Sequence, residues 1–218
     1  MRIVIPDDYQ NAVRGLACFS KLAGHDVVVF NDTVREIAAL AERLEPAEAL
    51  VLIRERTPIG DELLSRLPRL RLISQTGKGT SHIDVAACTR RGIAVAAGTG
   101  SAYATAELTW ALVLASRRHI PYETARLRAG HWQSTMGLGL RGRTLGIWGY
   151  GKIGSVVAGY GRAFGMNVLV WGREGSRSRA QADGYAVAAD RNALFEQSDV
   201  LSLHVKLNEE TRGLVTAS

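Results

Sequence analysis

The chain has 218 residues, of which 46% are hydrophobic and 22% charged, as in a globular protein with a buried core. Its formal net charge is +6, but the arginines are scattered and form no basic stripe, so we expect no nucleic-acid partner. The sequence has no long apolar run and no signal-peptide layout, which predicts a cytoplasmic protein without membrane contact. Cys18 and Cys88 belong to no Cys/His cluster, so we expect buried thiols and no metal site.

Short apolar runs of the strand type alternate with helical patterns in the first half of the chain. Strands are predicted at residues 2–6, 27–30, 50–53, 72–74 and 93–96. Apolar residues at helical spacing predict helices at 34–44, 61–67 and 83–91. This alternation indicates a parallel sheet with helices on its faces.

A glycine-rich stretch at 98–100 leads into a long apolar pattern that runs from residue 102 to about residue 130. The pattern predicts one long helix, or two helices with a break at Pro121. Beyond it, strands are predicted at 144–148, 167–171, 186–188 and 200–203, with helices after the first of these and at 191–197. We therefore expect an α/β protein of two doubly wound parallel-sheet domains with a boundary near 98–102; a single sheet is the alternative.

A glycine-rich turn joins the strand predicted at 144–148 to the helix after it. Its residues are Gly149, Tyr150, Gly151, Lys152, Ile153 and Gly154. Gly149 permits the tight turn, Gly151 lets the backbone approach a diphosphate, and Gly154 lets the helix pack closely on the strand. A turn without a ligand is the alternative, but the strand before it and the helix after it favour a dinucleotide cofactor.

The residues after the next strand bear on which cofactor binds. NAD-specific folds usually carry an acidic residue at this strand end, which binds the adenosine ribose. Here Gly172 takes that place, and Arg173, followed by two more arginines, can bind a 2′-phosphate. This favours NADP slightly over NAD, although Glu174 can serve the ribose of NAD if the strand is longer than predicted.

Three segments resemble the D-isomer-specific 2-hydroxyacid dehydrogenases. Residues 130–132 (GHW) look like that family's G-x-W, and residues 140–146 (LRGRTLG) resemble its L-x-G-x-T-x-G run. Residues 203–214 are similar to its H-x-P-L-T-x-x-T-x-x-L segment near the adenine, which implies cofactor contacts from His204, Val205 and Thr211. Lys206 and Asn208 depart from this segment, where proline and threonine are usual.

The first half of the chain carries two more segments similar to the family. Residues 51–57 (VLIRERT) resemble its R-x-x-T strand end, and residues 75–84 (QTGKGTSHID) its G-x-G-x-x-x-I-D loop. In the family, backbone N–H groups of that loop hold the substrate carboxylate. The resemblance implies substrate binding by Arg54, Gly77, Lys78 and Gly79, with Lys78 as a charged contact; a solvent-facing lysine is the alternative.

The resemblance implies a flavodoxin-like substrate domain at residues 1–99 and a Rossmann NAD(P)-binding domain at 100–218. The family is commonly dimeric through the latter, so we expect a homodimer. It also implies hydride transfer between NAD(P)H and a small 2-oxo acid or D-2-hydroxy acid.

The family's catalytic arginine, glutamate and histidine all follow the segment that resembles 203–214. We therefore expect an incomplete second domain, no catalytic residue within the chain, and no activity from the chain by itself. A non-catalytic NAD(P)-binding sensor or scaffold is the alternative. Another Rossmann oxidoreductase is disfavoured by the loop at 75–84.

Overall fold

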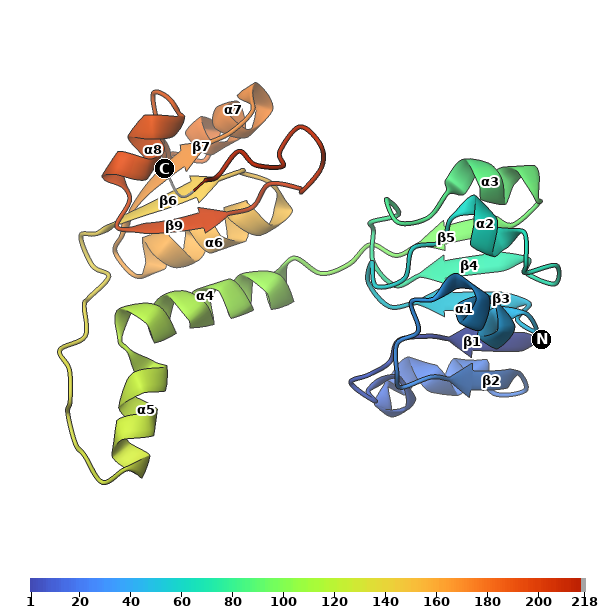
Figure 1. Ribbon diagram of the computed structural model, residues 1–218. Coiled ribbons are helices and arrows are strands. Elements are labelled where there is room, and N and C mark those ends of the chain that lie inside the picture. Colours follow the sequence, from blue (N-terminus) through green and yellow to red (C-terminus); the bar gives the residue numbers. More distant parts are fainter. Residues whose placement is uncertain (217–218) are drawn as a thin grey trace. The chain divides into compact units, whose positions relative to one another are not determined.

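The computed structural model describes residues 1–216 as two compact units, Met1–Gly100 and a second unit that begins at Ser101 (Figure 1). Each unit has its own sheet, and every pair of neighbouring strands within a sheet is parallel. The prediction of two parallel sheets is confirmed, and the single-sheet alternative is wrong.

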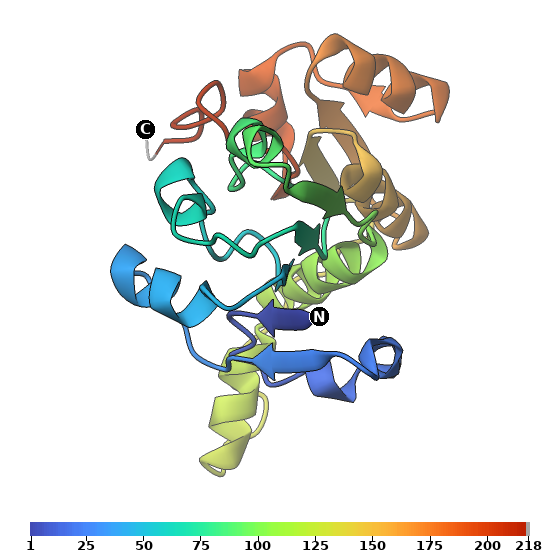
Figure 2. The ribbon, with the colours of Figure 1, turned by 90° about the vertical axis from the view of Figure 1, so that its right-hand side faces the viewer.

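The first unit has a five-stranded sheet in the order β2-β1-β3-β4-β5. Its strands are β1 (Arg2–Ile5), β2 (Asp26–Val29), β3 (Ala49–Leu52), β4 (Leu72–Gln75) and β5 (Ala94–Ala97). Figure 2 shows β1 and β2 side by side, in dark blue and blue. This order is the flavodoxin-like one, and it reverses direction between β1 and β3.

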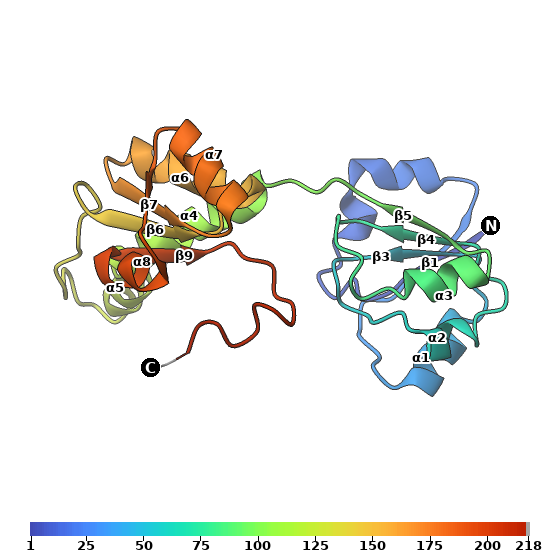
Figure 3. The same cartoon turned by 90° about the horizontal axis from the view of Figure 1, so that it is seen from above.

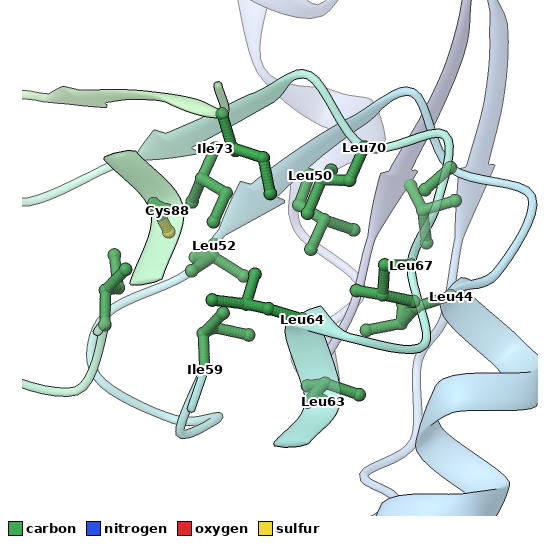
Figure 4. Packing of buried hydrophobic residues seen from close by; sticks show 14 of the residues in the cluster. Leu44, Leu50, Leu52, Ile59, Leu63, Leu64, Leu67, Leu70, Ile73 and Cys88 are labelled. Atoms are coloured by element: carbon green, nitrogen blue, oxygen red, sulfur yellow. The ribbon is translucent and has the colours of Figure 1, made fainter. Parts of the chain in front are cut away.

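Helical segments cover both faces of this sheet (Figure 3). One face carries α1 (Ile37–Leu44), α2 (Asp61–Leu64) and α3 (Val85–Arg90), and the other carries the short 3-10 helices η1 (Val13–Gly15) and η2 (Ala17–Leu22). Leu44, Leu50, Leu64 and Ile73 are at most 2% exposed in the core on the α1 side (Figure 4). Packing of this kind holds the strand ends in place.

Three details of the first unit differ from the sequence predictions. Helix α1 begins at Ile37 and not at residue 34, because the Glu36 side chain accepts bonds from the N–H groups of Ala38 and Ala39 and caps it there. Helices α2 and α3 are shorter than predicted. Cys88 is buried as expected, but Cys18 is exposed because it lies on the outer side of η2; both thiols are free.

The described residues of the second unit form a four-stranded sheet in the order β8-β7-β6-β9. Its strands are β6 (Thr144–Trp148), β7 (Asn167–Trp171), β8 (Ala186–Val187) and β9 (Val200–Leu203). Counted within the unit, this is the 3-2-1-4 order of a Rossmann sheet, with the reversal between β6 and β9. After Thr144, the remaining four residues of the central strand β6 are apolar and buried, because the strand is covered on both faces.

Five helices belong to the part of this unit that the structure describes, residues 101–216. They are α4 (Tyr103–Arg117), α5 (Ile120–Arg128), α6 (Lys152–Ala163), α7 (Glu174–Ala182) and α8 (Arg191–Gln197). Helices α4 and α6 share one core cluster through Trp110 and Val157, while α8 packs through Leu194 into a separate cluster with Trp148. Helices α4 and α6 therefore pack on one face of the sheet and α8 on the other.

The break between α4 and α5 lies at His119 and not at Pro121. His119 has a left-handed φ of +52°, and Pro121 stands in the first turn of α5, where its missing N–H costs no bond. Helix α7 was not predicted, because Ala180 is its one buried residue and the remainder of its sequence is polar. Within residues 1–216, no helix has the length and apolarity needed to cross a membrane.

Candidate functional site

A groove of about 450 Å³ opens at the carboxyl ends of three neighbouring strands of the second unit. The ends of β6, β7 and β9 contribute Trp148, Gly149, Gly172, Arg173, His204 and Val205. Strand order reverses between β6 and β9, and open parallel sheets bind ligands in the crevice at such a point. The groove is therefore the candidate ligand site of this unit.

The glycine turn between β6 and α6 shapes one wall of the groove. Gly149 has a φ of +99°, which favours glycine, and its N–H donates to the carbonyl of Trp171 (2.8 Å). A Cβ on Gly154 would overlap the carbonyl oxygen of Gly149, so the helix reaches the strand end this closely because residue 154 has no side chain. A Cβ on Gly151 would meet no atom within 4 Å. Gly151 therefore borders open space.

The first turn of α6 presents N–H groups beside that open space. Gly151 is the N-cap residue and supplies no capping side chain. The Ser155 N–H donates to the Gly151 carbonyl (3.0 Å), and this is the first hydrogen bond of the helical i to i−4 pattern. The N–H groups before it, together with the positive end of the helix dipole, suit an anion such as a phosphate.

The Tyr150 side chain anchors this turn to α7. Its hydroxyl donates to the carboxylate of Asp183 (2.6 Å), and its carbonyl accepts a bond from Arg179 (3.0 Å). Burial and the Asp183 carboxylate raise the pKa of Tyr150 well above its ordinary value, so the hydroxyl stays protonated and remains a donor. Tyr150 and Lys152 do not line the groove but a second cavity of about 410 Å³, which Gly151 also lines.

Arg173 is the charged residue that leads from β7 into the groove. Strand β7 ends at Trp171, so Glu174 begins α7 and does not extend the strand. The carboxylate of Glu174 pairs with Arg177, one turn along the helix, and Glu174 does not line the groove. Arg173 does line it, and its Nη2 lies 2.6 Å from the carboxylate of Glu210.

The segment after β9 forms the opposite wall. His204, Val205, Lys206, Asn208 and Thr211 all line the groove. Thr211 Oγ1 donates to the Lys206 carbonyl (2.6 Å), and the Thr211 N–H donates to Asn208 Oδ1 (3.0 Å). Lys206 and Asn208 are the two positions that depart from the family segment. Here the Asn208 side chain closes the turn that holds Thr211 in place.

His204 predicts a pH dependence for the stability of this unit. Its Nε2 lies 2.9 Å from Ser202 Oγ, and burial lowers its pKa below the ordinary value. The unfolded chain therefore takes up a proton at higher pH than the folded chain does. The contribution of neutral His204 to the free energy of unfolding is fully present above about pH 6.5. It is lost as the pH falls from there through the pKa that His204 has in the folded protein.

We expect the His204→Gln variant to have a weaker dependence of unfolding free energy on pH between about pH 7 and about pH 5. Urea unfolding followed by tryptophan fluorescence measures this dependence. All four tryptophans lie in the second unit, at positions 110, 132, 148 and 171. Burial also lowers the pKa of His82, but His82 lies in the first unit. The tryptophan signal therefore does not report unfolding of the unit that contains His82. An unchanged slope in the variant would contradict the prediction.

The residues predicted to bind substrate lie in two neighbouring loops of the first unit. Arg54 follows β3 with a φ of +57°, and its carbonyl accepts a bond from Gln75 Nε2 (2.9 Å). Gly77, Lys78 and Gly79 follow β4, and the Lys78 side chain is exposed. Because β3 and β4 are adjacent and parallel, these loops leave the sheet at the same edge. The Gln75 bond links them.

A buried polar cluster that was not predicted from the sequence lies where the first sheet reverses. Asp7 follows β1, is 3% exposed and has a φ of +63°. Its carboxylate accepts a bond from the Thr57 hydroxyl, and its carbonyl accepts one from Arg56, whose guanidinium lies over the Tyr9 ring. These residues fill the point where such sheets often bind ligands. Two consecutive acids directly after an apolar strand were the available signal.

The groove of the second unit fits a nicotinamide dinucleotide. Such a cofactor needs N–H donors for its diphosphate, a polar side chain at the adenosine ribose and apolar surface for the adenine. The first turn of α6, Arg173, and Val205 with Leu214 offer these groups, and Gly151 leaves space for close approach. Residues 1–216 contain no group of three or more His, Cys, Asp or Glu residues that could hold a metal ion.

Comparison with known proteins identifies the family. The family model described as "D-isomer specific 2-hydroxyacid dehydrogenase, NAD binding domain" matches residues 110–218. The chain belongs to this family. The predicted resemblance is thereby confirmed, and the match covers the domain described as NAD-binding in the family.

Several members of the family are similar to the chain. It is 40% identical over 190 residues to a glyoxylate reductase from Aeropyrum pernix, covering 82% of this chain and 56% of the relative. It is 36% identical over 179 residues to a D-3-phosphoglycerate dehydrogenase from Methanocaldococcus jannaschii, covering 81% of this chain and 34% of the relative. The crystal structure of phosphoglycerate oxidoreductase from Vibrio cholerae O395 has a TM-score of 0.94 at 57% identity, covering 99% of this chain and 70% of that one. The chain thus spans between about a third and just over half of the length of the two relatives compared by sequence.

Proposed function

We propose that the protein is an NAD(P)-dependent D-2-hydroxyacid dehydrogenase that transfers a hydride between NAD(P)H and a small 2-oxo acid. The observation that carries the proposal is the groove at the reversal point of the second sheet, where Gly151 borders open space beside the first turn of α6. A relative that is named for reducing glyoxylate supports a small 2-oxo acid as the substrate. The proposal assigns cofactor binding to residues 100–218 and substrate binding to residues 1–99.

In this proposal the bound cofactor supplies or accepts the hydride, and the chain holds and orients it. The glycine turn at residues 149–154 holds the diphosphate through the free N–H groups at the start of α6. Gly172 and Arg173 lie at the adenosine ribose, and His204, Val205 and Thr211 lie on the adenine side. Glu174 pairs with Arg177 and does not line the groove, whereas Arg173 does. The proposal therefore favours NADP slightly over NAD.

The proposed substrate residues are Arg54, Gly77, Lys78 and Gly79. The glycine N–H groups bind the substrate carboxylate, and the Lys78 ammonium adds a charge-assisted contact. An exposed contact of this kind contributes about 1 kcal/mol.

We expect the Lys78→Ala variant to raise the KM for the 2-oxo acid roughly fivefold and to leave kcat unchanged, because the contact is equally strong in the ground state and the transition state. Steady-state kinetics of the complete enzyme measure both constants. Lys21→Ala, which removes the same charge from η2, serves as the control and should leave KM unchanged. An unaltered KM for Lys78→Ala would assign this lysine to the solvent-facing surface.

The proposal assigns proton transfer to none of the chain's histidines. Burial lowers the pKa of both His82 and His204, which disfavours the protonated form that a proton donor needs. The remaining three, His25, His119 and His131, are exposed or half-buried. We expect the chain by itself to bind the cofactor without turning it over.

We also propose a homodimer that forms through the second unit. Large apolar side chains on α5 and in the segment after it are exposed, among them Leu127 (55%), Trp132 (75%) and Met136 (91%). Exposed apolar surface of this extent marks an interaction site. Sedimentation velocity should give the mass of two chains, and a monomer would contradict this part of the proposal.

The loss of reduced-nicotinamide absorbance with glyoxylate, hydroxypyruvate or pyruvate tests the function directly. Turnover of one of these acids by the protein that contains this chain supports the dehydrogenase. Cofactor binding without turnover of any 2-oxo acid favours a sensor or scaffold instead.

A further inference from the structure

Two oppositely charged side chains meet across the groove. Arg173, on the β7 side, and Glu210, in the segment after β9, are joined by an ion pair with an Nη2 to Oε2 distance of 2.6 Å. Both residues line the groove, and their side chains are 79% and 74% exposed. The pair is therefore open to solvent, and a ligand anion can replace the Glu210 carboxylate on the Arg173 guanidinium.

Glu210 is the acidic residue of this groove. Among the described residues that line it, Glu210 alone carries a carboxylate. The end of β7, where NAD-specific folds place such a group, has Gly172 instead, and the carboxylate of Glu174 is held by Arg177.

A short hydrogen-bonded turn holds Glu210 in this position. The Asn208 N–H donates to Thr211 Oγ1 (2.9 Å), and the Thr211 N–H donates back to Asn208 Oδ1 (3.0 Å). Glu209 and Glu210 lie between Asn208 and Thr211. Glu210 lines the groove, whereas Glu209 does not. Two glutamates of one turn thus differ in whether they face the groove.

We infer that Glu210 sets the preference between NADP and NAD by competing with the cofactor's 2′-phosphate for Arg173. The inference rests on the proposed function. A 2′-phosphate must displace the Glu210 carboxylate from the guanidinium and then lie close to that carboxylate, which repels it. The ribose 2′-hydroxyl of NAD is uncharged, so it meets no such repulsion and the ion pair can persist. Glu210 thereby reduces the preference for NADP that Arg173 gives to the groove.

The test compares Glu210→Gln with Glu209→Gln. Each variant removes one negative charge from the same turn and keeps the size of the side chain. Calorimetric titration with NADPH and with NADH gives both dissociation constants for the wild type and each variant, at low and at high salt.

We expect Glu210→Gln to bind NADPH roughly threefold to tenfold more tightly, to bind NADH with unchanged affinity, and to lose most of the gain at high salt. Glu209→Gln should leave both constants unchanged. An unchanged or weaker affinity of Glu210→Gln for NADPH overturns the inference, as does an equal gain in Glu209→Gln. A folded wild type that binds neither cofactor overturns the proposed function, and this inference with it.

Discussion

The Gly151→Val variant is expected to lose about a hundredfold in affinity for the nicotinamide cofactor while keeping its fold. Gly151 has a φ of −106°, which valine can adopt, and a Cβ there meets no atom within 4 Å. The added side chain therefore does not strain the protein. It occupies the space beside the first turn of α6 that the diphosphate is proposed to fill.

A matched variant in the same helix controls for this change. Gly159 is exposed, and a Cβ on it also meets no atom within 4 Å, but it lies two turns further along α6. Gly159→Val should leave both cofactor affinity and stability nearly unchanged, because valine and glycine have similar helix propensities. Dissociation constants from calorimetry and melting temperatures separate binding from folding. Wild-type affinity in Gly151→Val would show that the diphosphate does not bind at this turn.

The Gly154→Ala variant is expected to destabilise the second unit by about 3 kcal/mol. A Cβ at this position would overlap the carbonyl oxygen of Gly149 and lie 3.3 Å from Ile147 Cγ2. Neither neighbour can move freely, since one is backbone and the other belongs to a fully buried residue of β6. The helix must therefore shift away from the strand end.

Urea unfolding followed by tryptophan fluorescence measures this loss, because the four tryptophans report on the second unit. Gly159→Ala is the control and should stabilise the unit by about 0.5–1 kcal/mol, since its methyl group meets no neighbour and alanine favours the helix. Equal stability of Gly154→Ala and the wild type would contradict the close packing of α6 on β6.

The strands were predictable because each is a short apolar run. In a parallel sheet covered on both faces, a strand such as β6 has a run of apolar residues because its side chains are buried on both sides. The glycine turn was also predictable, since Gly149 and Gly154 are required by backbone geometry that no other residue satisfies without strain. Local rules of this kind can be read from sequence.

Features that depend on distant contacts could not be predicted. Helix α7 has little apolar pattern, and its position depends on links such as the bond from Arg179 to Tyr150. The Arg173–Glu210 pair joins residues 37 positions apart, so no local motif points to it. For the same reason the sequence left the role of Glu174 open, and the structure turns its carboxylate toward Arg177.

Dinucleotide binding at the first turn of α6 is tested most directly by a calorimetric titration of the folded protein with NADPH and with NADH. We expect saturable binding of one cofactor per chain, greatly weakened in Gly151→Val and retained in Gly159→Val. Absence of binding by either cofactor, or equal binding by both variants, would contradict a dinucleotide site at the first turn of α6.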